Sequence, residues 1–191
     1  MKRKTSLIQT SFKMSAILTK KERKFIKRRD RELHETLTAM IMFQELNDVK
    51  KMCIPNCIFL RAYFHSNDFP ESSLVPMIGC WKADDGTFKV VLHMKVRLIC
   101  YDADTGKKVQ MDYDPSVEWN TKQVRWCDKF ADFEWGTTPT EMKKDALSRL
   151  IVFKEIADRI NSSTDYVQIG IEFKDYLVRL TEFMAELRKL K

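Results

Sequence analysis

The chain has 191 residues and a net charge of +7; 44% of its residues are apolar, and it has only five Gly and five Pro. This composition excludes fibrous and low-complexity proteins, and the length suits one globular domain with a sizeable core. Apolar runs stay well short of the roughly 18 residues of a membrane-spanning helix, so we expect no membrane span.

The basic charge is concentrated at the amino end. Residues 1–31 carry twelve Lys or Arg and two acidic residues, a net charge of +10, whereas residues 32–191 carry a net charge of −3. Such segregation indicates a polyanionic partner, either a nucleic acid or an anionic membrane surface. We expect residues 1–18 to form a flexible or disordered basic tail. A mitochondrial presequence is the alternative for this stretch.

One long helix is predicted from Thr19 to about Met52. Thr19 and Glu22 have the spacing of a capping box, and apolar residues recur at helical spacing in the second half. The first turns are rich in cations instead. We therefore predict a single domain, 19–191, from which residues 19–31 project as a basic helix. Its predicted phosphate contacts are Lys20, Lys21, Arg23, Lys24, Lys27, Arg28, Arg29 and Arg31.

Alternating patterns replace helical spacing between residues 54 and 136. We predict a strand at 57–65 (CIFLRAYFH), a polar loop (HSNDFPESS) and a short strand around Met77–Trp81. The clearest strand is Thr87–Tyr101, in which every second residue from Phe88 to Cys100 is apolar. The sequence DADTG then predicts a hairpin turn into another strand.

The return strand of that hairpin is predicted at Lys107–Tyr113, and a last extended stretch covers Gln123–Trp135. The polar face of the 87–101 strand carries Lys89, Lys95 and Arg97, which we predict to extend the phosphate-binding surface. The alternative is the ordinary wet face of an antiparallel sheet. His93 lies on the same face, and we interpret it as an ordinary polar-face residue.

Two helices are predicted after the strands. Thr138 and Pro139 are typical of a helix start, and that helix runs to Asn161. Ser162 then begins a heptad helix through Lys191. The segment YVQIGIEF also fits a strand. The whole pattern predicts an α+β fold with a long basic amino-terminal helix, a central antiparallel sheet of four to five strands, and two carboxy-terminal helices covering one sheet face.

The heptad seam of the last helix suits a coiled coil with a second copy or another protein. We expect most of this seam to pack within the domain, with the final turns nearest to any partner. The residues predicted to serve a homo- or hetero-oligomer are Phe173, Leu180, Phe183, Leu187 and Leu190.

No metal or cofactor site is expected from the spacing of the Cys and His residues. Cys53 and Cys57 are not followed by a second Cys or His pair at the spacing of a structural zinc site. The sequence has no nucleophile elbow and no phosphate-binding Gly loop. Carboxylates between residues 112 and 134, such as Asp112 and Asp132, leave a metal-dependent nuclease as an alternative, but we expect no enzyme.

The leading hypothesis is a non-enzymatic nucleic-acid-binding protein that contacts the phosphate backbone of RNA or DNA. A viral packaging or nucleoprotein component fits as well as a cellular one. The stretch KKERKFIKRR resembles a nuclear import signal, so we expect an intracellular, nuclear protein. The alternative function is an interaction or scaffold subunit that pairs through the helix at 162–190.

Overall fold

The computed structural model describes residues 20–67, 71–82, 85–101, 108–116, 125–127, 140–163 and 171–189, with backbone alone for 20–27, 29, 80–82, 88, 100, 101 and 125–127. The predicted tail at 1–18, Thr138, Pro139 and Leu190 lie outside the described residues. The predicted α+β class with an antiparallel sheet is confirmed. In order, the elements are α1 (Lys20–Leu46), α2 (Cys53–Ser66), β1 (Ser72–Lys82), β2 (Phe88–Tyr101), β3 (Lys108–Tyr113), β4 (Arg125–Cys127), α3 (Thr140–Asn161), the 3₁₀ turn η3 (Ile171–Phe173) and α5 (Lys174–Lys189).

Among the described residues, the sheet has three long strands and the three-residue β4, in the order β3-β2-β1-β4 with every pair antiparallel. The β1–β2 hairpin is its backbone, paired from Ser72 opposite Leu98 to Lys82 opposite Phe88. β1 is much longer than the strand predicted around Met77–Trp81. Pro76 is tolerated inside it because β4 pairs only with residues 78–80, so Pro76 has no described strand on that side.

The two faces of the sheet differ as the alternation in β2 predicts. Leu92, Met94, Val96 and Leu98 are buried on one face, where they are joined by Leu74 and Ile78 of β1. His93, Lys95 and Arg97 lie on the opposite face. The register therefore separates an apolar layer from a polar layer.

The segment predicted as a strand at 57–65 is instead the middle of α2. A short apolar run does not distinguish a buried strand from a buried helix by periodicity, and that prediction was wrong for this reason. Pro55 lies in the first turn of α2, where no backbone N–H is needed, and it marks the helix start. The helix is enclosed by its neighbours; its buried residues are Pro55, Asn56, Cys57, Ile58, Leu60, Arg61 and Phe64.

The predicted single helix from Thr19 to Met52 is also corrected, because α1 ends at Leu46. The Asn47 side chain donates to the Phe43 carbonyl oxygen at 2.8 Å and caps this end. Asp48 and Lys51 then adopt positive φ angles of 46° and 60°, which reverse the chain into α2. Asn and Asp near a helix end favour such a turn.

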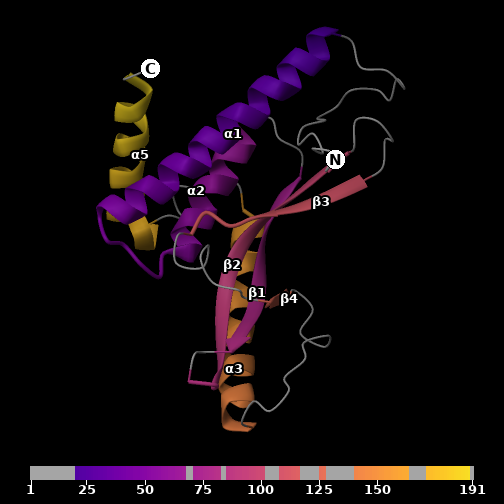
Figure 1. Cartoon of the computed structure of the whole chain (residues 1–191), viewed down its shortest axis with the longest axis vertical. Helices are drawn as coiled ribbons and strands as arrows, with labels where there is room; N and C mark the ends of the chain where they lie inside the picture. Colours follow the sequence, from indigo (N-terminus) through magenta and orange to yellow (C-terminus); the bar gives the residue numbers. More distant parts are fainter. Residues whose placement is uncertain are drawn as a thin grey trace.

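The carboxy-terminal helices do not both cover the sheet, contrary to the prediction. α3 packs along β1 and β2, with Ala146 and Leu150 against Ile78 and Leu92, while α5 packs on α1 and α2. Figure 1 shows α3 running along the hairpin and α5 standing beside α1. α2 packs on β1 and β2 and also contacts α5, with Phe64 in the shared core.

The heptad helix does not begin at Ser162. The Ser162 hydroxyl donates back to the Asp158 carbonyl oxygen at 2.7 Å, so this residue closes α3. Residues 164–170, most of the stretch with the alternative strand pattern, lie outside the described residues, and helical structure resumes at Ile171.

Arg61 joins α2 to β1 and to the end of α3. Its guanidinium, which is buried, donates to the carbonyl oxygens of Ile160 at 2.9 Å and of Asn161 and Ser163 at 3.1 Å each. Its Nε donates to the Ser72 carbonyl oxygen at 3.3 Å. A cation at the carboxyl end of a helix satisfies carbonyls that have no intrahelical partner.

Candidate functional site

The first candidate site is the basic arm, defined here as Lys20–Arg31 of α1. Among the side chains that the structure describes, the buried residues of α1 begin at Leu33 and continue through Gln44, so its second half anchors the helix. Its amino-terminal turns extend past α2 and α5 (Figure 1). The twelve residues of the arm span roughly 18 Å as a helix. They carry eight Lys or Arg and two acidic residues.

Two arm cations have described ion pairs, both at the surface. Arg28 Nε lies 2.7 Å from Glu32 Oε1, and Arg31 Nε lies 3.9 Å from Glu35 Oε1. The Arg28 and Arg31 side chains are still 71% and 72% exposed. Exposed pairs four residues apart contribute only about 0.3–0.5 kcal/mol, so a phosphate can compete for either cation. The side chains of the other predicted arm cations lie outside the described set.

The second predicted surface, on the sheet, has a different character. Arg97 donates from Nε and Nη2 to the two carboxylate oxygens of Asp112 at 2.7 and 2.9 Å, and the two residues are direct cross-strand partners. Lys95 Nζ lies 4.0 Å from Asp114 Oδ2. All four side chains are less than about a third exposed, so carboxylates of the same face already neutralise these two cations.

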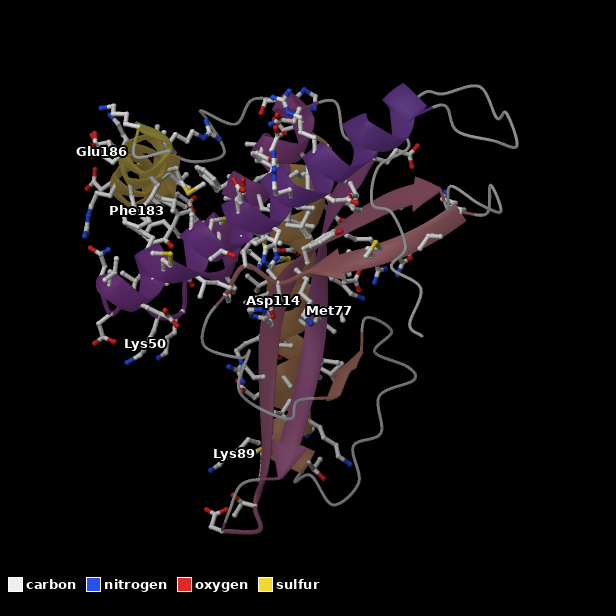
Figure 2. The ribbon with its side chains drawn as sticks, turned by 45° about the horizontal axis from the view of Figure 1, so that its top comes forward. Lys50, Met77, Lys89, Asp114, Phe183 and Glu186 are labelled. Atoms are coloured by element: carbon white, nitrogen blue, oxygen red, sulfur yellow. The ribbon has the colours of Figure 1, made fainter. Side chains whose placement is uncertain are left out.

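Lys89, the third predicted sheet cation, is exposed near the tip of the β1–β2 hairpin, at the other end of the molecule from the basic arm (Figure 2). The structure therefore does not join Lys89 and the arm into one surface. Lys95 and Arg97 lie between them on the sheet, held in their ion pairs.

A buried cluster around His93 was missed by the sequence reasoning. The His93 ring is only 1% exposed, and its Nε2 lies 2.8 Å from Asp114 Oδ1. The Cys53 thiol lies near the same ring, and both side chains line one cavity. Asp114 is fixed in turn by the backbone N–H of Ser116, which donates to Oδ1 at 3.1 Å. Asp114 follows β3 where that strand leaves β2 (Figure 2).

Burial and the polar partners act in opposite directions on His93. Desolvation is the largest single influence and lowers the pKa of the ring, but the hydrogen bonds and charges of Asp114 and Cys53 together outweigh it. The net effect raises the pKa of His93 from 6.5 to about 9. The ring is therefore an imidazolium at neutral pH, paired with the Asp114 carboxylate.

The two cysteines of α2 have different surroundings. Cys53 is the first residue of the helix and is partly exposed, while Cys57, one turn later, is fully buried. The Cys57 thiol donates to the Met94 carbonyl oxygen at 3.2 Å, and burial raises its pKa well above the usual value. Cys57 is therefore a neutral core residue, whereas Cys53 faces a cavity. A spacing of four residues places Cys53 and Cys57 on one face of a helix, but this could be inferred only after α2 was assigned as a helix.

The cavity beside Cys53, called the thiol cavity below, has a volume of about 370 Å³. Cys53, His93 and Ser116 contribute its reactive and polar groups. Ser116 is 4% exposed, and its Oγ has no hydrogen-bond partner among the described residues. The remaining lining residues are Gln44, Val49, Lys50, Lys51, Met52, Val91, Leu92, Arg149 and Phe153.

Within the described ranges, no three His, Cys, Asp or Glu side chains come together in a way that could hold a metal ion. Likewise, the described helices include none long and apolar enough to cross a bilayer. The chain matches no protein family, no curated protein and no solved structure. The functional assignment therefore depends on the geometry of these two sites.

The seam predicted to pair with another chain faces inward over its described part. Leu180 is fully buried, and Phe173, Phe183 and Leu187 pack against the same core. Phe183 meets Phe43 of α1 with ring centroids 5.5 Å apart. These contacts occupy the apolar face on which the scaffold alternative depends.

Proposed function

We propose that the protein binds nucleic acid through the basic arm, with contacts to the phosphate backbone. The observation that carries the proposal is the position of the arm, a helix with eight cations that extends past α2 and α5, while the described buried residues of α1 begin at Leu33. Contacts of this kind depend on charge and do not distinguish DNA from RNA. A nuclear location follows from the same basic stretch and belongs to the proposal.

The sheet cations are not assigned to this interface. Lys95 and Arg97 already pair with carboxylates, and freeing them would expose those carboxylates to the phosphates. The basic arm itself has only two acidic residues against eight cations, and Arg28 and Arg31 stay more than two-thirds exposed despite their pairs with Glu32 and Glu35. Backbone binding is thus proposed for the arm alone, without a contribution from Lys89 at the distant hairpin tip.

A salt-dependent titration tests the proposal against single- and double-stranded DNA and RNA. The test variant replaces Lys24, Lys27, Arg28 and Arg31 with Gln, which removes four cations from one side of the arm helix. We expect its affinity to fall by about a hundred-fold or more at 50 mM salt. Its slope of log affinity against log salt should flatten by roughly 0.7–0.9 for each lost contact.

A matched control removes the same charge elsewhere, with Gln at Lys144, Lys154, Lys174 and Lys189, all of which are exposed. We expect this control to stay close to wild type in affinity. Equal losses in the two variants would show that only net charge matters and would overturn the assignment to the arm. Absence of wild-type binding to all four nucleic acids at low salt would end the proposal.

A further inference from the structure

The thiol cavity contains a constellation that nucleic-acid binding does not use. The Cys53 thiol and the His93 imidazole line the same cavity, and the Asp114 carboxylate hydrogen-bonds to that imidazole. They come from the start of α2, the middle of β2 and the residue after β3, and only the fold brings them together. A nucleophile next to a base that a third group orients is the general arrangement of covalent catalysis.

We propose that the thiol cavity is an acyl-transfer site, in which Cys53 is the nucleophile toward a small acyl compound that carries a negative charge. This site is separate from the basic arm and goes beyond the function proposed above. It also departs from the expectation, drawn from the sequence, that the chain is not an enzyme.

The surroundings of Cys53 suit a nucleophile. It occupies the first turn of a 14-residue helix, where backbone N–H groups point out of the helix end, and the Met52 side chain does not cap that end. His93 lies inside the protein with a fixed partner on Nε2, so its ring is held in one orientation. Asp114 is a positioning residue, because it touches His93 and is not among the described residues that line the cavity.

The cavity wall indicates the charge of the ligand. Lys50, Lys51 and Arg149 line it, and neither Asp nor Glu is among the described lining residues. Asp48 and Asp145 pair with Lys50 and Arg149 from outside the wall, which holds the two cations in place. A concave surface with one sign of charge concentrates ligands of the opposite sign.

The orphan hydroxyl of Ser116 points to a ligand independently of the charges. A buried hydroxyl without a partner costs about 1–3 kcal/mol, and a polar ligand that reaches it removes this cost. Phe153, Val91 and Leu92 supply an apolar wall for the acyl chain. A volume of about 370 Å³ fits a compound of small-metabolite size.

The reaction requires only the acyl compound and water. The Cys53 sulfur attacks the carbonyl carbon as its proton passes to solvent, a C–S bond forms, and the carbonyl π electrons move onto oxygen beside the first turn of α2. Collapse of this oxyanion breaks the bond to the leaving group, which departs with its electron pair and takes a proton from the His93 imidazolium. Water then attacks the thioester while His93 accepts its proton, and the C–S bond breaks to release Cys53, whose sulfur takes a proton from solvent.

A pair of matched esters tests the proposal on the wild-type protein. The anionic probe is the mono-para-nitrophenyl ester of adipic acid, and the neutral probe is the same compound with its free carboxyl methylated. Glutathione in the same buffer supplies the reference rate for each ester. We expect a burst of nitrophenolate and a mass increase of one acyl group on Cys53. The anionic ester should be preferred over the neutral one, relative to glutathione, by about ten-fold or more.

Substitutions then test which residues cause the reaction and its preference for the anionic ester. Cys53→Ala should remove both the burst and the mass increase. Lys51→Asn with Arg149→Gln should remove the anionic preference, since Asn tolerates the positive φ at 51; the exposed pair Lys144→Gln with Lys154→Gln is the control. Asp114→Asn should move the acylation–pH midpoint downward, which a loss of packing alone would not do.

The outcomes decide the proposal even when a variant fails to fold, because the ester comparison needs only the wild-type chain. It is overturned when native Cys53 is not acylated, or when the two esters react with the same ratio as with glutathione. It is also overturned when acylation maps to another cysteine and survives Cys53→Ala. Reaction at Cys53 with an anionic preference that the rim variant removes supports it.

Discussion

The basic arm and the polar face of the sheet carry the same residue types but present them differently. Arg28 and Arg31 lie on a helix and remain more than two-thirds exposed despite their pairs with Glu32 and Glu35. Arg97 faces Asp112 across the strands, with both carboxylate oxygens bound. The comparison shows that the residue type does not decide whether a cation can bind a ligand. The side chains that surround the cation in the folded protein decide it.

The largest expected effect concerns salt and the basic arm. When six or more of its eight cations contact phosphate, raising salt from 50 to 200 mM weakens binding by about a thousand-fold. The thermal unfolding midpoint should change little over the same range, because the described buried residues of α1 lie beyond the arm. Anisotropy titrations and calorimetry, measured in the same buffers, check the two halves of this comparison.

Removal of the buried cation Arg61 should have the opposite result, a large loss of stability with no change in affinity. Arg61→Met leaves the carbonyl oxygens at the end of α3 without their donor, which we expect to cost about 3 kcal/mol or more of unfolding free energy. Affinity for nucleic acid should stay unchanged in the folded fraction. Urea unfolding measures the loss, and Arg159→Met, on the exposed side of α3, is the matched control. Equal stability of the two variants would contradict the role given to Arg61.

The His93–Asp114 pair predicts a pH dependence of stability. Because folding raises the pKa of His93 from 6.5 to about 9, its contribution is fully present below about pH 6.5 and is lost as pH rises through about 9. The loss is on the order of 2–3 kcal/mol. The groups that face the ring are Asp114 and Cys53, with Lys95 near the carboxylate.

Urea unfolding at a series of pH values, for wild type and His93→Gln, measures this contribution. The stability difference between the two should shrink as pH rises through the window, since the variant lacks the titrating ring. Burial raises the pKa of Tyr176 to about 12 and that of Cys57 well above its usual value, so their contributions fall at higher pH, outside the window. Parallel curves for the two proteins would rule out the charged pair.

The smallest effect is expected on the sheet face. Asp112→Asn removes the carboxylate opposite Arg97, and a partly exposed pair at the sheet surface contributes about 1 kcal/mol or less. The freed guanidinium should raise affinity for nucleic acid by only a few-fold. A larger gain, approaching the loss in the arm variant, would show that the sheet face is a latent part of the interface and would erase the distinction between the two regions.

Much of the fold followed from local patterns, and the candidate cavity did not. The alternation in β2 is a signal within one element, and it survived because one face of the strand is buried, whereas the Thr-Pro start predicted before α3 lies outside the described residues. α2 was misassigned because it is apolar on most sides and has no clean period. When α2 is assigned as a strand, the sequence does not predict that Cys53 lies near His93.

Asp114 needed the register as well. Tyr113, the last residue of β3, pairs with Val96, so the residue after the strand arrives beside His93 and Lys95. The register depends on which residues of several strands face the core. The sequence of a hairpin turn alone does not specify it. The basic arm, in contrast, can be identified from the sequence without any tertiary contact, because its cations lie close together in the chain.

The contacts of Arg61 have a consequence for synthesis of the chain. Arg61 is synthesised early, whereas its hydrogen-bond partners at the end of α3 lie about a hundred residues further along the chain. Until the segment up to Ser163 leaves the ribosome, the guanidinium has no such acceptors, and α2 cannot settle on the sheet. We therefore expect nascent chains stalled near residue 150 to be degraded by protease, and chains extended past residue 163, clear of the exit tunnel, to become resistant together in α2 and α3.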